Sequence, residues 1–279
     1  MPAHVFTYTY KDSTYNTLLN FIAYKLAISK KRAKQLLDKR LVFVNKRRTW
    51  IASYQLNRGD VVEVLTEDTQ SSLSKKGIIL YQDDHYLIVS KPPGILTNGA
   101  ESLENNLKIY VKNNHLRAVH RLDKDTSGVV IFAMNKDAFE CMKTLFKENL
   151  VKKVYRVIVK GNVEIQNFTI DTPLHGQKAV THVKLLKTGR DTSYLEVNIE
   201  TGRTHQIRIH LASAGYPVIG EMEYNRKPIE NPLLRHIRRQ MLHAYQITFA
   251  HPYTHKTISI TAEIPDDFNQ NLKTLGLAG

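Results

Sequence analysis

Apolar residues near the start of the chain recur at the spacing of a helix: Leu18, Leu19, Ile22 and Leu26. Ser29 is placed to cap a second helix, which the pattern predicts over residues 30–39. In that helix Leu36 and Leu37 are expected to face inward. The first part of the chain therefore contains two predicted helices, one directly after the other.

Short stretches rich in β-branched and aromatic residues predict strands. In the first part of the chain they cover residues 41–46 and 61–65. Later strands are expected over residues 78–81, 86–89, 129–134, 154–159, 168–171, 181–186 and 193–199. The pattern from residue 77 onward is thus rich in β-structure, with helices in between.

Two helices are predicted among these later strands. The first covers residues 136–146, and the second begins within the run 200–212. The buried stripe of the second helix is expected to consist of Ile207, Leu211 and Ala214. Arg208 lies beside this stripe and can reach inward from its edge. Gly215 is well placed to end the helix, because glycine is common just after the last helical residue.

The stretch Thr66–Lys76 is polar, rich in serine and nearly free of apolar residues, which is typical of a linker. We place a small domain at residues 1–66, a linker at 67–77 and a larger domain at 78–279. A chain of 279 residues is near the length at which single cores divide, so two domains fit this size.

Charge separates the two parts of the chain. The sequence has 40 Lys and Arg against 26 Asp and Glu, a net charge of +14. Of this, the first 66 residues carry +8, and four cations crowd the first turns of the predicted helix 30–39: Lys30, Lys31, Arg32 and Lys34. Positive charge at a helix N-terminus opposes the helix dipole, which favours a role in binding phosphate. A solvated basic face is the alternative.

Composition excludes several classes of protein. The single cysteine, Cys141, rules out an internal disulfide and a cysteine-rich zinc site, and it fits a reducing compartment. His205 and His210 are five residues apart, a poor spacing for a metal pair on one helix face, so we expect no metal site. Without a membrane-length apolar run or a signal-like start, the protein is expected to be cytoplasmic and not membrane-bound.

A basic, polar loop runs into Gly128, and a β-branched strand begins directly after it. Such a junction holds loop side chains at the end of a sheet, where catalytic groups are often found. If the segment before the turn is extended, Arg121 and Asp123 share one face. A cation and a carboxylate presented together suit an anionic substrate.

Three interpretations of this loop compete. A polar turn, in which Asp and Ser bond to their own backbone, explains it most simply. A calcium loop fits the first half, from Asp123 to Gly128, but Met134 stands where a bidentate Glu is required, so calcium is rejected. The third interpretation is a catalytic Asp in an enzyme that acts on nucleic acid.

The segment His120–Gly128 reads His-Arg-Leu-Asp-x-x-Thr-Ser-Gly and resembles the signature of the RluA-type pseudouridine synthases. The run 201–211, Thr-Gly-Arg-Thr-His-Gln-Ile-Arg-x-His-Leu, matches a second long segment of that family. Its usual continuation Gly-Asp-x-x-Tyr-Gly stands here as 220–225, with Glu and Asn replacing Asp and the last Gly. We expect these two changes to alter a loop and not the chemistry.

Further segments match the same family in the correct order: 84–94 with its Lys-Pro-x-Gly, 153–161, 239–244 and 249–252. The first 66 residues, with two helices, a Val-x-Val-Asn strand and a Gly-Asp turn, resemble the alpha-L RNA-binding motif. The resemblance implies an α+β protein. Its small basic RNA-binding module precedes a mixed, mostly antiparallel β catalytic domain with flanking helices.

The resemblance also implies residue roles. Asp123 is the catalytic carboxylate, as nucleophile or as base on the sugar, and Arg208 keeps it ionised. Tyr155 lies over the uracil, although a strand tyrosine is more often a packing residue. Arg121 occupies the space that the flipped uridine leaves and contacts phosphate. Arg203 and His205 join the RNA-binding residues.

The expected function is therefore isomerisation of uridine to pseudouridine in structured RNA, most simply in large-subunit ribosomal RNA. It requires no cofactor and no metal, and a monomer suffices. Transfer RNA is an alternative substrate, and a non-catalytic ribosome-assembly factor is an alternative function. A nucleoside hydrolase is a third candidate, but it needs a second carboxylate, for which Asp125 is the nearest residue.

Overall fold

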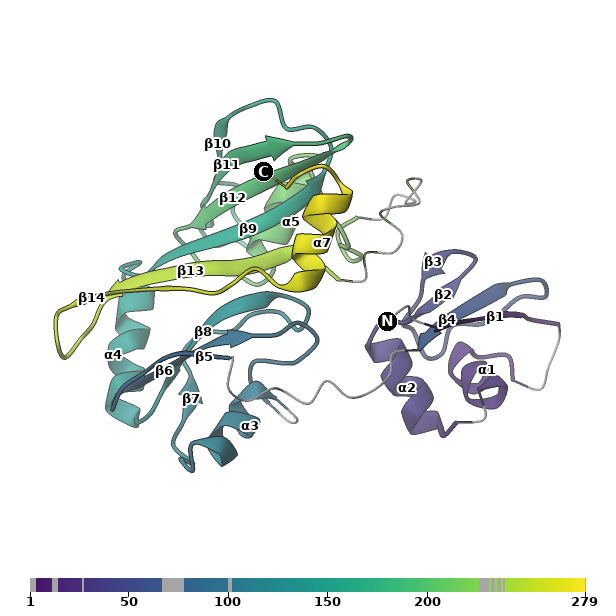
Figure 1. Ribbon diagram of the computed structural model, residues 1–279, viewed down its shortest axis with the longest axis horizontal. Coiled ribbons are helices and arrows are strands. Elements are labelled where there is room, and N and C mark those ends of the chain that lie inside the picture. Colours follow the sequence, from purple (N-terminus) through teal and green to yellow (C-terminus); the bar gives the residue numbers. More distant parts are fainter. Residues whose placement is uncertain are drawn as a thin grey trace. The chain divides into compact units, whose positions relative to one another are not determined.

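The computed structural model describes residues 4–11, 15–26, 28–66, 78–99, 102–225, 231, 234, 237 and 239–278. The chain forms two compact units, residues 1–73 with 228–238 and residues 74–227 with 239–279 (Figure 1). The predicted linker 67–77 lies outside the described residues, so the predicted domain boundaries stay a prediction. Among the described residues, no helix has the length and apolar character needed to cross a membrane.

The described part of residues 4–66 in the first unit forms a small sheet with two helices. Its elements are β1 (His4–Thr9), α1 (Leu18–Lys25), α2 (Lys30–Asp38), β2 (Val42–Val44), β3 (Arg47–Arg48) and β4 (Val61–Thr66). The strands pair in the antiparallel order β1-β4-β2-β3. The core contains Leu18 and Phe21 of α1, Leu37 of α2, and Val42 and Val64 of the sheet.

Both predicted helices of this unit are confirmed. The Ser29 hydroxyl caps α2 by accepting a hydrogen bond from the Arg32 backbone N–H at 3.2 Å. Leu36 and Leu37 are buried as expected, because they lie on the face of α2 that packs against the sheet. Strand β1 was not predicted, and it extends the sheet beside β4.

The second unit is built around a ten-stranded sheet. Its strands are β5 (Ile79–Gln82), β6 (Tyr86–Lys91), β7 (Arg117–Ala118), β8 (Ser127–Ala133), β9 (Lys152–Lys160), β10 (Asn167–Ile170), β11 (Thr181–Thr188), β12 (Thr192–Ile199), β13 (Leu242–Ala250) and β14 (Thr257–Thr261). Its helices are α3 (Leu103–Tyr110), α4 (Lys136–Lys147), α5 (Gln206–Ser213) and α7 (Asp266–Thr274).

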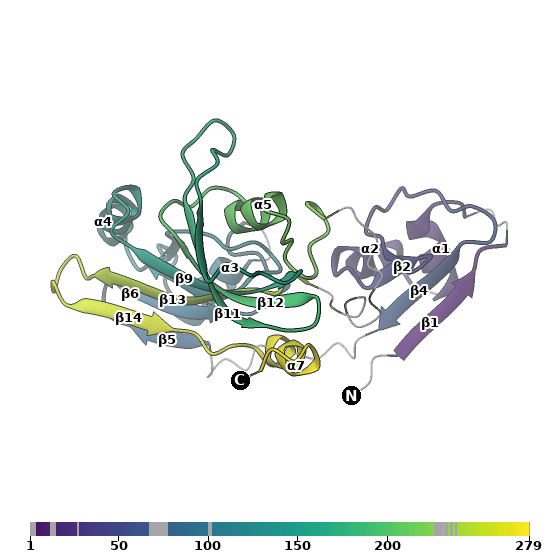
Figure 2. The same cartoon turned by 90° about the horizontal axis from the view of Figure 1, so that it is seen from above.

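The order of strands confirms the mixed, mostly antiparallel α+β fold. The main path is β10-β11-β12-β9-β13-β8-β6-β5, with β14 beside β13 and β7 beside β8. Only β13 and β8 pair in parallel among the named strands of this sheet. Figures 1 and 2 show the strands as one curved surface, with α4, α5 and α7 lying against it.

The parallel pair explains the glycine of the signature. Gly128 lies opposite Ala244 and has a φ of +118°, which an L side chain rarely adopts. A Cβ at this position would lie 2.1 Å from the Ala244 carbonyl oxygen. Only glycine therefore lets β8 approach β13 this closely, and the loop that precedes Gly128 is held at the centre of the sheet.

Helix α5 begins later than the matching segment and is buried on more than one side. Ile207 and Leu211 are buried as predicted, but Ala214 is exposed at the C-terminal cap, so its place in the stripe was wrong. Gln206, Arg208 and His210 are buried instead, because polar partners surround the helix. Gly215, with a φ of +87°, ends the helix as expected.

Candidate active site

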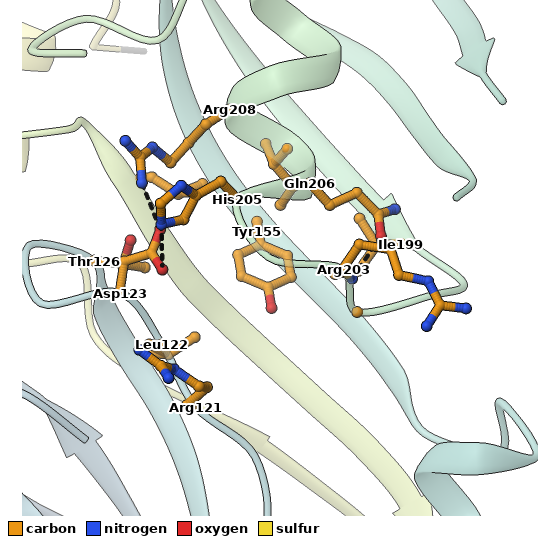
Figure 3. Close-up of a pocket in the computed structure, with 13 residues that line it drawn as sticks. Arg121, Leu122, Asp123, Thr126, Tyr155, Ile199, Arg203, His205, Gln206 and Arg208 are labelled. Carbon is orange, nitrogen blue, oxygen red and sulfur yellow. Dashed lines mark hydrogen bonds and ion pairs between the residues drawn. The ribbon is translucent and has the colours of Figure 1, made fainter. Parts of the chain in front are cut away.

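Asp123 projects from the loop before β8 toward the N-terminal half of α5 (Figure 3). One carboxylate oxygen accepts a hydrogen bond from Arg208 Nη1 at 2.9 Å, and the other lies 3.4 Å from His205 Nε2. The Asp123 side chain is 23% exposed, so it remains accessible to a substrate. The geometry thus offers an ion-paired carboxylate with an open side.

The loop that carries Asp123 is fixed by the backbone on both sides of it. The Leu122 backbone N–H donates to Thr97 Oγ1 at 3.0 Å, and the Thr97 hydroxyl is also 3.0 Å from the Leu122 carbonyl oxygen. The Thr126 N–H closes the turn by donating to the Asp123 carbonyl at 3.1 Å. The carboxylate is therefore presented from a tied turn.

Lys91 is hydrogen-bonded to the same loop through the Lys124 carbonyl oxygen. Its side chain is fully buried, and Nζ donates to the carbonyl oxygens of Pro92, Ile95 and Lys124 at 2.9–3.1 Å. Burial lowers the pKa of Lys91 to about 7. Three carbonyl acceptors match the three N–H groups of the ammonium form, so this lysine joins the Lys-Pro-Pro-Gly loop to the loop that carries Asp123.

Arg208 is held by carboxylates on three sides. Its Nε and Nη2 donate to the two oxygens of Glu221 at 2.6 and 2.9 Å, and Nη2 also donates to Glu223 at 3.1 Å. Only 4% of its side chain is exposed. Burial opposes the charge, but the Glu221 and Asp123 carboxylates outweigh it and raise the pKa of Arg208.

Glu221 is the fixed member of this set. Its side chain is completely buried, and one oxygen accepts from the backbone N–H groups of Met222 and Glu223 at 2.8 and 2.7 Å. Burial alone would raise the pKa of Glu221, but Arg208 and these N–H groups lower it overall. Gly220 makes the turn possible, because a Cβ there would lie 1.9 Å from the Arg239 carbonyl oxygen.

His205 lines the pocket and also lies next to the carboxylates of Asp123 and Glu223. It precedes α5 with a left-handed φ of 56°. Its Nδ1 lies 2.7 Å from the Tyr224 hydroxyl and 3.5 Å from Glu223. The imidazole therefore stands between the carboxylates of Asp123 and Glu223.

Tyr155 lies at the centre of the sheet on β9 and lines the same pocket as Asp123 (Figure 3). Burial, with a smaller contribution from the negative charge of Asp123, raises the pKa of its phenol. The phenol is therefore neutral at physiological pH. A neutral aromatic ring next to the carboxylate suits stacking on a planar base.

One cavity, of about 470 Å³ including space open to solvent, unites most of the predicted site residues. It is lined by six of them: Arg121, Asp123, Tyr155, Arg203, His205 and Arg208. Apolar walls come from Leu122, Ile199, Ile207 and Leu242. The arrangement can hold a planar, hydrogen-bonding ring beside a carboxylate, in a cavity that arginines also line.

The four predicted cations of the first unit do not join this cavity. Lys30, Lys31, Arg32 and Lys34 are exposed on α2. Lys34 Nζ pairs with Asp38 at 2.8 Å, and Arg32 Nη1 donates to Gln35 at 3.2 Å.

Among the residues that the structure describes, no group of three or more His, Cys, Asp or Glu side chains could hold a metal ion.

Sequence reasoning missed the groups that orient the named residues. The replacement of the family's Asp by Glu221 was expected to alter only a loop, whereas Glu221 binds Arg208. Thr97, which binds the Leu122 backbone, was not considered. The only available signal for Glu221 was its place after Gly220 in a matched segment. Arg239 binds the Asp125 carbonyl at 3.2 Å and pairs with Asp267, so it also supports the loop.

Known structures share this arrangement of strands. The human protein named RNA pseudouridylate synthase domain containing 4 aligns with 71% of this chain and 92% of its own, with a TM-score of 0.64 and 24% identity. The human protein named RNA pseudouridylate synthase domain containing 1 aligns with a TM-score of 0.59 and 23% identity, over 72% of this chain and 95% of its own. The second unit therefore has the pseudouridine synthase fold.

Sequence relatives define the family. Residues 85–213 match the RNA pseudouridylate synthase model, and residues 17–62 match the S4 domain. The ribosomal large subunit pseudouridine synthase D of Zymomonas mobilis is 31% identical over 229 residues, covering 71% of this chain and 72% of that protein. The Bacillus subtilis protein YhcT, described as an uncharacterized RNA pseudouridine synthase, is 34% identical over 221 residues, covering 70% and 71%.

The chain belongs to the RNA pseudouridine synthase family, in its RluA-type branch, and carries an S4 RNA-binding domain. It is an isomerase of uridine in RNA.

Proposed function

We propose that this protein converts specific uridines of large-subunit ribosomal RNA to pseudouridine, with Asp123 as the catalytic carboxylate. The observation that carries the proposal is the Asp123–Arg208 ion pair, at 2.9 Å, in a cavity shared with Tyr155. The RNA class is supported by the name of the Zymomonas mobilis relative, a ribosomal large subunit pseudouridine synthase D.

The reaction rearranges bonds without changing oxidation state. The bond between uracil nitrogen 1 and the ribose breaks, the base rotates, and a new bond forms from carbon 5. The proton on carbon 5 is removed, and nitrogen 1 ends protonated, so atoms balance within the nucleotide. Asp123 acts on the sugar as nucleophile or base, and the Arg208 guanidinium orients it through the hydrogen bond at 2.9 Å.

The other pocket residues hold the flipped nucleotide. Tyr155 stacks on the uracil through its neutral ring, which the raised pKa of the phenol favours. Arg121 is exposed beside Asp123 and fills the space left in the RNA stack, where it contacts phosphate. Arg203 and His205, which also line the cavity, bind the RNA.

The α2 cations add phosphate affinity that does not depend on sequence. Lys30, Lys31, Arg32 and Lys34 are all exposed and can replace counterions on RNA. We propose that the protein acts in the cytoplasm as a monomer, without cofactor or metal. The predicted domain limits, 1–66 and 78–279 around the linker 67–77, divide binding from chemistry in this scheme.

Tritium release from RNA labelled at uracil carbon 5 tests the substrate class. The wild-type protein is expected to release tritium from large-subunit ribosomal RNA and not from a pool of transfer RNA. Release from transfer RNA alone would show that transfer RNA, and not ribosomal RNA, is the substrate. RNA binding without release from either would favour an assembly factor, and free uracil as the product would indicate hydrolysis.

A further inference from the structure

Two tyrosines stack on the surface of the first unit. The rings of Tyr15 and Tyr24 have centroids 4.8 Å apart and planes inclined by 28°. Tyr15 is 39% exposed and Tyr24 is 56% exposed. The core contacts of α1 come from other residues, Leu18, Phe21 and Ile22. The stacked pair therefore places aromatic surface in solvent without completing the core.

Cations lie against the aromatic rings of this unit. Lys25 Nζ is 5.5 Å from the centre of the Tyr24 ring. The Arg40 guanidinium is 4.6 Å from the Trp50 ring, and that of Arg48 is 5.1 Å from Phe43. Such contacts occur roughly once per 70–80 residues in proteins. Here three cations make them within the described part of residues 21–50, so cations and aromatics are interleaved.

The stacked pair and the α2 cations are close along the chain. Helix α1 ends at Lys25, and α2 begins at Lys30 with exposed Lys30 and Lys31. Lys30 is six positions after Tyr24, and a chain of that length spans about 20 Å at most when fully extended. A few nucleotides of single-stranded RNA can bridge that distance, so one strand can contact both features.

We infer that the Tyr15–Tyr24 pair is a stacking platform for an unpaired base of the bound RNA. The inference rests on the proposed function, because it takes RNA as the ligand. Every base offers a π-face to a tyrosine, whereas the neighbouring Lys25 and Lys30 select a polyanionic chain over an apolar protein surface. The first unit, which contains the S4 domain, thus recognises single-stranded RNA through stacking as well as through charge.

The test compares two hairpin RNAs of equal length, one fully paired and one with a single-stranded bulge containing 2-aminopurine. The variant is the full chain with Tyr15→Leu and Tyr24→Leu, which keeps apolar bulk and removes the aromatic faces. Its affinity for the bulged RNA is expected to fall roughly fivefold or more. Affinity for the paired RNA and the salt dependence are expected to stay unchanged. The wild type is expected to quench the 2-aminopurine fluorescence, and the variant is not.

Two controls separate stacking from charge and from folding. Ile51→Ala removes another apolar side chain, 54% exposed on the same unit, and should alter neither affinity. Lys25→Gln should reduce the salt slope by about one, because it removes a cation. Thermal unfolding of each variant confirms that the unit still folds.

Equal affinities of the variant and the wild type for bulged RNA would overturn the platform while leaving the proposed function intact. Loss of both affinities to the same extent would also overturn it. If the wild type bound neither hairpin, the proposed function would fail as well. A change in sedimentation without a change in RNA affinity would assign the pair to self-association instead.

Discussion

At the scale of single residues, Arg208 links Asp123 to the buried carboxylate of Glu221. Its guanidinium contacts Asp123 at 2.9 Å while Glu221 binds it through two hydrogen bonds. Glu221 is buried and tied to backbone N–H groups, so it cannot move toward the substrate. The guanidinium is thereby fixed, and of the two carboxylates Asp123 and Glu221, Asp123 lines the cavity.

Substituting Glu221→Gln should weaken both activity and folding. Removing one partner of a buried ion pair typically costs about 3–5 kcal/mol of unfolding free energy. Because Arg208 would then be misplaced, kcat is expected to fall on the order of 100-fold with a smaller change in KM. Steady-state kinetics and urea unfolding measure the two effects. Glu221→Asp, the residue usual in the family, is the matched control and should retain most activity; an inactive Asp variant would contradict this positioning role.

A second residue-scale prediction concerns pH. His243 is fully buried, with Nδ1 2.9 Å from the Ser127 hydroxyl and Nε2 3.2 Å from the Ala262 carbonyl oxygen. Burial lowers the pKa of His243 to about 4. The unfolded chain, with an ordinary His pKa near 6.5, therefore binds more protons between these values, and stability is lost as pH falls.

From this residue alone, the unfolding free energy should be about 2 kcal/mol lower at pH 5 than at pH 7.5. Urea unfolding of the wild type and of His243→Gln at both pH values measures the contribution. The unfolding free energy of the variant should differ less between the two pH values than that of the wild type. Some pH dependence should remain, because burial also lowers the pKa of His120, to about 3. An unchanged difference would contradict a neutral buried imidazole.

At the scale of elements, the contact of β8 with β13 fixes the position of the loop that carries Asp123. Gly128→Ala should force the strands apart, because its Cβ would lie 2.1 Å from the Ala244 carbonyl oxygen. The expected loss is about 3 kcal/mol or more, from the clash and from the positive φ. Gly176→Ala is the matched control: its φ is +72° but no atom lies within 4 Å of the added Cβ.

The control should therefore lose only about 1–2 kcal/mol, the cost of left-handed backbone. Chemical unfolding of both variants measures the difference. Equal losses would show that close strand packing at Gly128 has no role beyond backbone conformation.

Elements with regular patterns could be predicted from the sequence, and others could not. The alternation around Tyr155 gave β9, and the capping Ser29 gave the start of α2. Helix α7 buries only Phe268 and Leu272, so its pattern was too sparse to detect. The parallel pairing of β8 with β13 joins residues more than 100 positions apart, and local periodicity carries no information about such a pair.

The candidate site divides in the same way. Asp123 and Arg208 are 85 residues apart, and a resemblance rather than any spacing brought them together. Glu221, which anchors Arg208, departs from the family residue and was therefore passed over. His205 was expected only to bind RNA. Its contact with Asp123 was missed, because its left-handed backbone conformation is set by the whole fold and not by the local sequence.

At the scale of the whole molecule, charge and chemistry belong to different units. The first 66 residues carry +8 of the net +14, while the carboxylate cluster lies in the second unit. Replacing the four α2 cations Lys30, Lys31, Arg32 and Lys34 by Gln should reduce the salt slope of RNA binding by up to about 3–4. At saturating RNA, kcat should not change.

The matched control replaces the exposed α4 lysines Lys136, Lys143 and Lys147 by Gln and should alter the slope much less. Fluorescence anisotropy over a range of salt concentrations gives both slopes. Equal slopes in the two variants would indicate that phosphate binding is spread over the whole surface.

The most direct test of the account compares Asp123→Asn with the wild type for two quantities on one RNA. These are the dissociation constant and the rate of tritium release from uracil carbon 5 in a single turnover. Asparagine keeps the size of the side chain but not its charge, so binding should be nearly intact while release is abolished. Release at a wild-type rate, or a loss of binding as large as the loss of release, would contradict the assignment of Asp123 as the catalytic carboxylate.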